Sequence, residues 1–284
     1  MEPSAPQSSK PPCDRADALA VLARLRDAGH IAYFAGGCVR DLLLNRLPKD
    51  WDIATDAPPK RVRQLFPNTQ AVGQAFGVIL VRHGRSVVEV ATFRAEGDYL
   101  DGRRPSEVRF TTAREDARRR DFTINGLFLD PSPTAPPPDG ASIAPLPSGT
   151  VIDFVGGLAD LHARLIRAIG NPTERFAEDH LRLLRAVRFA SRFQFAIDPL
   201  TADAIATHAD SLKRISPERI ADELRLMLTG DTRRHAWRML IDFGLLPIVY
   251  RFAPASPPSA FDDRRSIFLA LQHPAPLPFG LVLA

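Results

Sequence analysis

The sequence contains little cysteine, little lysine and no long apolar run. Its 284 residues include two cysteines, Cys13 and Cys38, which are too few for a disulfide framework and lack the Cys-x-x-Cys spacing of a zinc site. No segment approaches the roughly 18 uncharged apolar residues that span a bilayer, and the first residues lack the apolar core of a secretory signal. We therefore expect a cytoplasmic protein that does not associate with membranes.

Lysine occurs at four positions, so 33 of the 37 basic residues are arginine, although the net charge is only +4. The planar arginine fork suits phosphate groups and base edges. A general bias toward arginine would produce the same count. Only arginines at particular positions can therefore indicate a function.

The composition, with 45% hydrophobic and 25% charged residues, is typical of a folded globular chain. The length suggests two domains, and the patterns predict an α+β fold. A Pro/Ser-rich disordered tail (1–14) precedes a mixed domain (15–170) with a Pro-rich insertion (131–150), which we expect to be an exposed excursion of a hairpin. Helical periodicity follows over 171–232, and 233–284 is expected to be a truncated helical part.

Apolar runs predict the strands of the mixed domain, and apolar residues at helical spacing predict the helices. The expected strands are 31–37, 51–55, 76–83, 86–93, 108–112 and 122–129, and the expected helices are 16–28, 58–66, 174–193, 199–215 and 217–230.

Two acids, Asp50 and Asp52, lie in the segment KDWDIAT. Because alternate residues of a strand point the same way, both carboxylates would lie on one face, roughly 7 Å apart along the backbone. Two carboxylates together with phosphate oxygens and water suit Mg²⁺, and a metal ion held there can assist attack on a phosphate. An Asp-x-Asp without this context is more often a polar strand edge.

Gly36 and Gly37 separate a strand-like run from the helix-like VRDLLL. A strand, a tight turn and a helix start in this order expose backbone N–H groups that can receive phosphate. Glu89 lies in the apolar run SVVEVATF. Because burial of a lone carboxylate is unfavourable, Glu89 either pairs with a cation or joins Asp50 and Asp52 at the metal.

Five strings occur in a fixed order: GGCVRDLLL, DWDIAT, RRDFTINGL, DFVGGLADL and RAIGNPTERFAEDHLRLLRAVRFA. Together they resemble the class II tRNA CCA-adding enzyme and bacterial poly(A) polymerase family of polymerase-β-like nucleotidyltransferases. The resemblance implies a small mixed-sheet nucleotidyltransferase head with flanking helices, an all-α neck that selects the nucleotide, and a partial helical body. It also implies addition of nucleotides from CTP or ATP to an RNA 3′ end, without a nucleic-acid template and with Mg²⁺.

By position, the resemblance makes Asp50 and Asp52 catalytic metal ligands, with Glu89 as a further catalytic acid. It assigns the phosphate cradle and nucleotide site to Gly36, Gly37, Arg40, Arg120, Asp121 and Asn125. Gly126 replaces the alanine that is usual in the family. A solvated basic patch remains the alternative interpretation of Arg118 to Arg120.

The resemblance assigns base selection to Asp179 and Arg182, with Arg185 beside them. Three residues apart on a helix, Asp179 and Arg182 would share one face. Cytosine and adenine present an amine donor beside a ring-nitrogen acceptor, whereas uracil and guanine present a carbonyl beside an N–H. One acceptor and one donor would therefore take C or A and reject U or G. A surface ion pair is the simpler interpretation of the same spacing.

Three further segments resemble family motifs. The family's mobile loop corresponds to EGDYLDGRRPSEV, with matching positions at Tyr99, Asp101, Arg103, Arg104 and Pro105. A hinge between head and neck corresponds to Asp153, Gly156, Gly157 and Asp160. A later neck motif, to which we assign a structural role, corresponds to Glu218 and Arg219.

We expect the chain to add C and A to tRNA 3′ ends from CTP and ATP. A poly(A) polymerase or an A-only adding enzyme is the alternative within the family, because the same residue pair suits adenine. A catalytically idle RNA-binding remnant would fit the short C-terminal part. A small-molecule nucleotidyltransferase would share the Gly-Gly and Asp-x-Asp elements but would not need Asp179 and Arg182.

Overall fold

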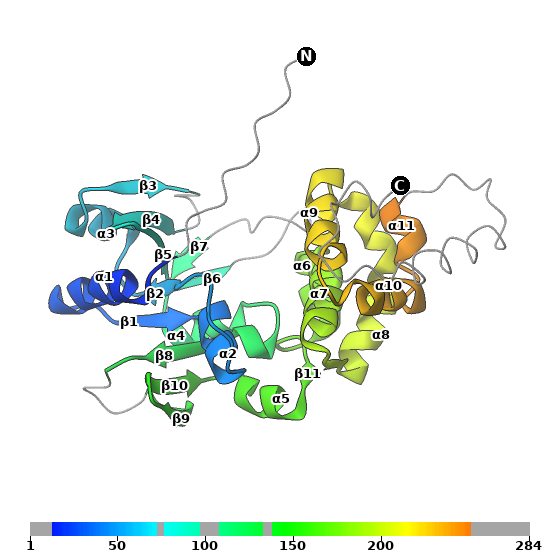
Figure 1. The fold of residues 1–284 in the computed structure, drawn as a ribbon, viewed down its shortest axis with the longest axis horizontal. Helices are drawn as coiled ribbons and strands as arrows, with labels where there is room; N and C mark the ends of the chain where they lie inside the picture. Colours follow the sequence, from blue (N-terminus) through cyan, green and yellow to red (C-terminus); the bar gives the residue numbers. More distant parts are fainter. Residues whose placement is uncertain (1–12, 73–76, 97–107, 133–137, 251–284) are drawn as a thin grey trace, which may run out of the picture. The chain divides into compact units, whose positions relative to one another are not determined.

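The computed structural model describes residues 13–72, 77–96, 108–132 and 138–250, and divides them into two compact units (Figure 1). The first unit contains the described residues up to Leu158, and the second contains those from Ala159 onward.

An eight-stranded sheet forms the centre of the first unit, with the strand order β3-β4-β5-β2-β1-β8-β10-β9. Its β2 and β5 are parallel and the other neighbouring pairs are antiparallel, so the predicted mixed sheet is confirmed. The strands are β1 (Ala32–Ala35), β2 (Ile53–Thr55), β3 (Thr69–Ala71), β4 (Val78–His83), β5 (Ser86–Thr92), β8 (Leu127–Asp130), β9 (Ser142–Leu146) and β10 (Gly149–Asp153). A separate pair consists of β6 (Arg94–Glu96) and β7 (Val108–Phe110).

Helices cover both faces of this sheet. On one face, α1 (Arg15–Asp27) and α3 (Pro59–Leu65) contact each other and β4 and β5. On the other face, α4 (Ala113–Arg118) places Ala117 in a core cluster with Tyr33, Phe93 and Phe128. The remaining helical elements are α2 (Gly37–Leu43), a 3₁₀ turn (Thr123–Asn125) and α5 (Gly157–Ala163), which crosses from the first unit to the second.

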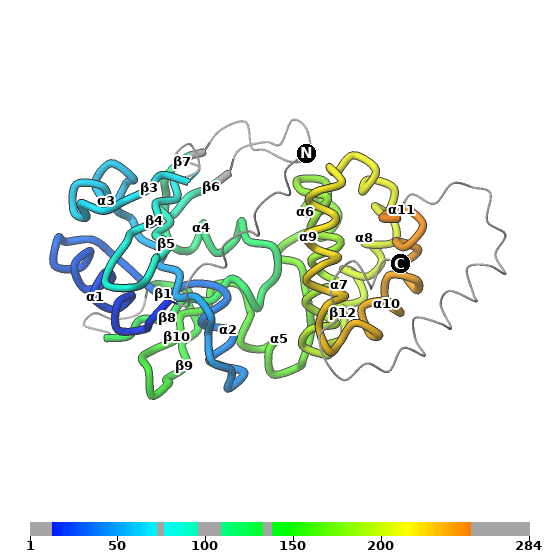
Figure 2. The backbone as a smooth tube through the Cα atoms, turned by 45° about the horizontal axis from the view of Figure 1, so that its top comes forward, coloured from blue at the N-terminus to red at the C-terminus, as the bar shows by residue number. Residues whose placement is uncertain are grey.

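The second unit is helical except for one short parallel strand pair, β11 (Leu165–Ile166) and β12 (Ala196–Ile197). In this unit α7, α9 and α10 pack against one another (Figure 2). Its helices are α6 (Pro172–Glu178), α7 (Arg182–Phe193), α8 (Pro199–His208), a 3₁₀ segment (Ala209–Arg214), α9 (Pro217–Leu228), α10 (Arg233–Asp242) and α11 (Leu246–Tyr250).

Two predictions of local structure are wrong. The expected strand 122–129 begins with the 3₁₀ turn and becomes a strand only at Leu127. The expected helix 174–193 is two helices, because Asp179 has extended backbone angles (φ −142°, ψ 104°) between α6 and α7. The Pro-rich insertion connects the antiparallel pair β8 and β10, as a hairpin excursion would, and it also adds the largely exposed strand β9, which pairs with β10; residues 133–137 lie outside the described ranges.

Within the part of the chain that the structure describes, no helix combines the length and the apolar character that crossing a membrane requires.

Gly157, at the start of α5, allows a close approach between two segments of the first unit. A Cβ atom added there would lie 2.3 Å from the carbonyl oxygen of Thr123 in the 3₁₀ turn. We predict that Gly157→Ala lowers the free energy of unfolding by about 2 kcal/mol, because the added methyl group overpacks against rigid backbone. Urea unfolding followed by circular dichroism measures this change.

Gly230→Ala is the matched control, since a Cβ atom at Gly230 meets nothing within 4 Å. Equal stability of the two variants would contradict the close approach.

Candidate active site

Asp50 and Asp52 lie directly before β2, not inside it. Trp51 between them is buried, packs edge-on against Phe34 at 4.9 Å and lies under the guanidinium of Arg15 from α1. Asp50 is exposed and Asp52 is half-buried. This alternation fits two carboxylates on the side of the sheet opposite α1.

The glycine turn before α2 lies next to Asp52. The backbone N–H of Ala35 donates to the Asp52 carbonyl (3.0 Å), and Cys38 follows in the first turn of α2. Burial, and then the charge of Asp52, raise the pKa of the Cys38 thiol to about 12. The thiol is therefore neutral at physiological pH, and the effect on its pKa indicates that the Asp52 carboxylate is near Cys38.

Gly36 brings a guanidinium group against this turn. Its backbone has a positive φ of 71°, and an added Cβ atom would lie 2.8 Å from Nη1 of Arg120. The same Nη1 donates to the Asn125 carbonyl (3.2 Å), and the guanidinium lies 5.2 Å from the centre of the Phe128 ring. The structure thus brings Arg120 against the Gly36 turn, and the residues on either side of this turn, Ala35 and Cys38, adjoin Asp52.

Asp116 holds Arg120 in this position. The Asp116 carboxylate is 1% exposed; its Oδ2 accepts from Nε and Nη2 of Arg120 (3.2 and 2.9 Å), and its Oδ1 accepts from Nε and Nη2 of Arg119 (2.9 and 2.6 Å). Burial alone would raise the pKa of Asp116, but the two guanidinium charges outweigh it and hold that pKa below its ordinary value.

Arg40, Asp121 and Asn125 form a second buried network. Nη1 of Arg40 donates to the Asn125 side-chain carbonyl, and the Asn125 amide donates to Asp121 (2.9 Å). Nε and Nη2 of Arg40 both donate to Asp41 (2.9 and 2.7 Å). In this arrangement Arg40 supports the helix behind the glycine turn, and Asn125 connects that helix to Asp121.

Glu89 is half-buried, so its carboxylate keeps some contact with water. The parallel register pairs Ile53 with Val90, so Asp52, just before β2, lies at the level of Glu89 within β5. Among the described residues, however, no three acidic, histidine or cysteine side chains are close enough to hold a metal ion. A two-carboxylate site at Asp50 and Asp52 fits this geometry, and a three-acid site does not.

In the second unit, Asp179 lies in the connection between α6 and α7. The prediction that it shares a helix face with Arg182 is therefore wrong. Oδ1 of Asp179 accepts from the Leu181 N–H (3.1 Å), and both carboxylate oxygens accept from Nη2 of Arg219 (3.3 and 3.2 Å).

Arg182 begins α7, and Glu178 holds its guanidinium (2.5 Å), as does the Arg175 carbonyl (3.0 Å). Arg185, one turn further along α7, lies 3.9 Å from the buried carboxylate of Glu223 and 5.3 Å from the Phe189 ring centre.

The structure describes some of the residues in the remaining predicted motifs. Tyr99, Asp101, Arg103 and Arg104 of the expected loop lie outside the described residues. Of the expected hinge, Asp153 accepts backbone hydrogen bonds from Val155, Gly156 and Leu158 (2.9 to 3.0 Å), and Asp160 accepts from Arg167 (3.1 Å). Glu218 is exposed in the first turn of α9.

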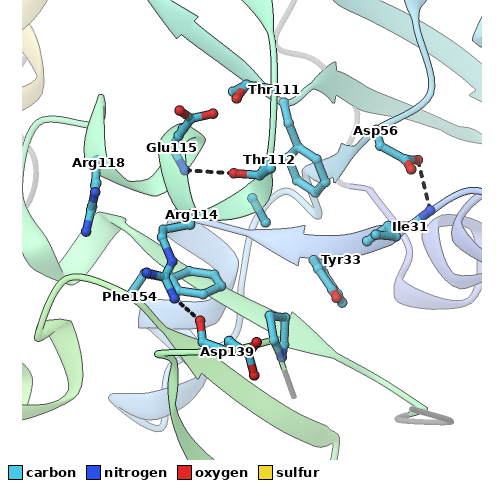
Figure 3. Close-up of a pocket in the computed structure, with 13 residues that line it drawn as sticks. Ile31, Tyr33, Asp56, Thr111, Thr112, Arg114, Glu115, Arg118, Asp139 and Phe154 are labelled. Carbon is cyan, nitrogen blue, oxygen red and sulfur yellow. Dashed lines mark hydrogen bonds between the residues drawn. The ribbon is translucent and has the colours of Figure 1, made fainter. Parts of the chain in front are cut away.

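A cavity of about 740 Å³ in the first unit contains none of the predicted site residues (Figure 3). Tyr33, Phe93 and Phe154 line it together with Arg114 and Asp56. Since Asp56 directly follows β2 whereas Asp52 precedes it, this cavity belongs to the opposite end of that strand.

Sequence reasoning missed Asp116 and Glu178, the carboxylates that hold Arg120 and Arg182. The spacing of Asp116 to Arg119 and Arg120, three and four residues apart on a helix, was the available signal. Glu178 has the same four-residue spacing to Arg182.

Two family models match the chain, one in each of its two parts. Residues 32–167 match the model described as the poly A polymerase head domain, and residues 194–255 match the probable RNA and SrmB-binding site of polymerase A. The chain belongs to the family of CCA-adding enzymes and bacterial poly(A) polymerases.

Relatives and solved structures agree with this assignment. The CCA-adding enzyme of Bacillus subtilis is 44% identical over 225 residues, which are 79% of this chain and 53% of that protein. A crystal structure of the Bacillus stearothermophilus CCA-adding enzyme in complex with CTP has 38% identity and a TM-score of 0.70, covering 81% of this chain and 52% of the other. A tRNA nucleotidyltransferase complexed with a primer tRNA and an incoming ATP analog has 26% identity and a TM-score of 0.70, with coverage of 89% and 67%. The chain spans about half the length of the curated relatives it matches.

Asp116 generates a prediction about stability and pH. Asp116→Asn should lower the free energy of unfolding at pH 7 by about 3 kcal/mol, because it leaves two guanidinium groups without their buried counter-charge. Since the pKa of Asp116 is lowered in the folded protein, its contribution is complete above the unfolded-chain value of about 3.9 and is lost as the pH falls through the lower folded-state value. Urea unfolding across pH 7 to 3 measures the difference from the unmodified chain.

Asp210→Asn, which changes an exposed acid paired with Lys213, is the control and should change stability little at any pH. A pH-independent loss in Asp116→Asn would show that the carboxylate charge does not hold the two arginines.

Proposed function

We propose that this chain adds C and A to the 3′ ends of tRNA in the cytoplasm, using CTP, ATP and Mg²⁺ and no nucleic-acid template. The observation that carries the proposal is the guanidinium of Arg120, which Asp116 fixes against the Gly36 turn beside Asp52. A fixed cation, a glycine turn and a half-buried carboxylate are the groups that a metal-bound triphosphate requires.

Asp50 and Asp52 would hold the Mg²⁺ ion. Their exposed and half-buried positions leave room for the water and phosphate oxygens that Mg²⁺ keeps in its coordination shell. When bound there, the ion supplies positive charge to the phosphate oxygens during transfer. Because Asp52 borders the glycine turn, its carboxylate would hold the ion next to the phosphate oxygens that the backbone N–H groups of the turn bind.

The chain's own residues position the triphosphate. Arg120 would donate to phosphate oxygens with the N–H groups that Asp116 and Asn125 leave unused, and its ion pair with Asp116 fixes the guanidinium plane before the nucleotide arrives. Pre-organised donors lower the barrier because they need no reorientation during the reaction. The RNA 3′-hydroxyl attacks the α-phosphorus and pyrophosphate leaves, so no protein side chain becomes covalently attached.

Asp179 and Arg182 would select the base. The Asp179 carboxylate offers an acceptor to the exocyclic amine of C or A, and the Arg182 guanidinium offers a donor to the neighbouring ring nitrogen. Although the two residues do not share a helix face, the extended backbone at Asp179 places it one short turn before the helix that Arg182 begins.

A-only addition is the second candidate, because residues 32–167 match the poly A polymerase head model and adenine satisfies the same pair of groups. Assays with CTP alone and with ATP alone, on tRNA that ends at the discriminator base, separate the two. Incorporation of C followed by A supports the proposed function, and A tails without C support the second candidate.

We predict that Asp52→Asn reduces nucleotide incorporation into this tRNA by at least a thousandfold, because it removes a metal-binding charge while the buried backbone contact of residue 52 with Ala35 remains. Incorporation of radiolabelled CTP and ATP with Mg²⁺ measures the loss.

Asp27→Asn changes an exposed acid at the end of α1 and should leave incorporation unchanged. Activity of Asp52→Asn within tenfold of the unmodified chain would remove Asp52 from the metal site.

A further inference from the structure

Arg219 holds Asp179 from outside the segment that carries the base-selecting pair. It lies in the first turn of α9, 40 residues along the chain from Asp179. Its Nη2 lies 3.3 and 3.2 Å from the two carboxylate oxygens of Asp179, and both side chains are about one quarter exposed. An ion pair in this position is shielded from water more than a surface pair, so it can fix a side-chain orientation.

The Asp179 carboxylate is held from two directions. The Leu181 N–H donates to Oδ1 (3.1 Å), which ties the carboxylate to the backbone that enters α7. Arg219 supplies the second direction from α9. A short side chain with two such anchors has little rotational freedom left, so its remaining acceptor positions point in a fixed direction.

The Arg219 side chain is partly buried where it pairs with Asp179. Its Nη1 atom is buried and has no hydrogen-bond partner in the described part of the chain. A buried donor without a partner is unfavourable by roughly 1 to 3 kcal/mol, and the ion pair of Nη2 with Asp179 offsets part of this cost.

The partner of Asp179 differs from the partner of Arg182. Glu178 holds the Arg182 guanidinium, and Arg175 in turn holds Glu178 (2.9 Å). The acceptor and the donor of the base-selecting pair are thus each fixed by an opposite charge of their own. A separate anchor for each group lets both keep a fixed orientation.

We propose that Arg219 is a positioning residue for base selection, which acts by holding the Asp179 carboxylate as an oriented acceptor for the exocyclic amine of C or A. This inference rests on the proposed function and deepens it, since Arg219 does not itself contact the base. It gives the later neck motif a role in specificity rather than only in the structure of the neck.

Equilibrium dialysis of the 284-residue chain with labelled CTP, ATP, UTP and GTP tests the inference. Arg219→Gln should reduce the preference for CTP over UTP, and for ATP over GTP, by at least tenfold. Asp179→Ala should do the same. The double variant should be no less selective than Asp179→Ala alone, because Arg219 acts only through that carboxylate.

Arg225→Gln is the matched control, because Arg225 lies on the same helix, is half exposed and pairs with Asp222; it should keep the full preference. Circular dichroism and the midpoint of thermal unfolding report whether each variant is folded. If Arg219→Gln does not fold, Arg219→Met, which keeps the length and the apolar stem of the side chain, takes its place.

Two results overturn the inference in distinguishable ways. A folded Arg219→Gln that keeps full preference, or a double variant less selective than Asp179→Ala, overturns the positioning role and leaves the proposed function standing. Equal binding of all four nucleotides by the unmodified chain overturns base selection itself, and with it both proposals.

Discussion

One buried carboxylate organises the candidate site of the first unit. Asp116 is almost completely removed from water, yet it stays ionised because two guanidinium groups neutralise it. Through Arg120 this charge reaches the Gly36 turn, where only a residue without a side chain leaves room. The position of the Arg120 guanidinium at the Gly36 turn is therefore set by a carboxylate on α4 and not by the turn itself.

The second unit uses the same chemistry. Asp179 pairs with Arg219, Glu178 with Arg182, and the buried Glu223 with Arg188 at 2.6 Å. Bidentate or short arginine–carboxylate pairs have a defined geometry that lysine would not give. The excess of arginine over lysine thus has a structural use in this chain, in addition to any role in contacting phosphate.

Sequence patterns predicted the elements with a clear apolar run or helical spacing, such as β4, β5 and α1, and they located the turn at Gly36. They failed where a single residue changes the backbone. The extended conformation of Asp179 divides one periodic segment into two helices, and Thr123–Asn125 forms a 3₁₀ turn inside a run that resembles a strand. Arg219 was not predicted as part of a site because its contact with Asp179, 40 residues away, leaves no periodic signal, whereas the four-residue spacing of Asp116 and Arg120 was visible but is also common in surface ion pairs.

The strand β9 is the last in the order of the eight-stranded sheet and contains Pro145, which is exposed and faces Thr150 in the register with β10. A proline has no N–H, so this border of the sheet carries one donor fewer than an ordinary strand. A border with a missing donor is a poorer template for a strand of another molecule. The proline-rich composition that looked incompatible with a sheet therefore protects the sheet against aggregation through its margin.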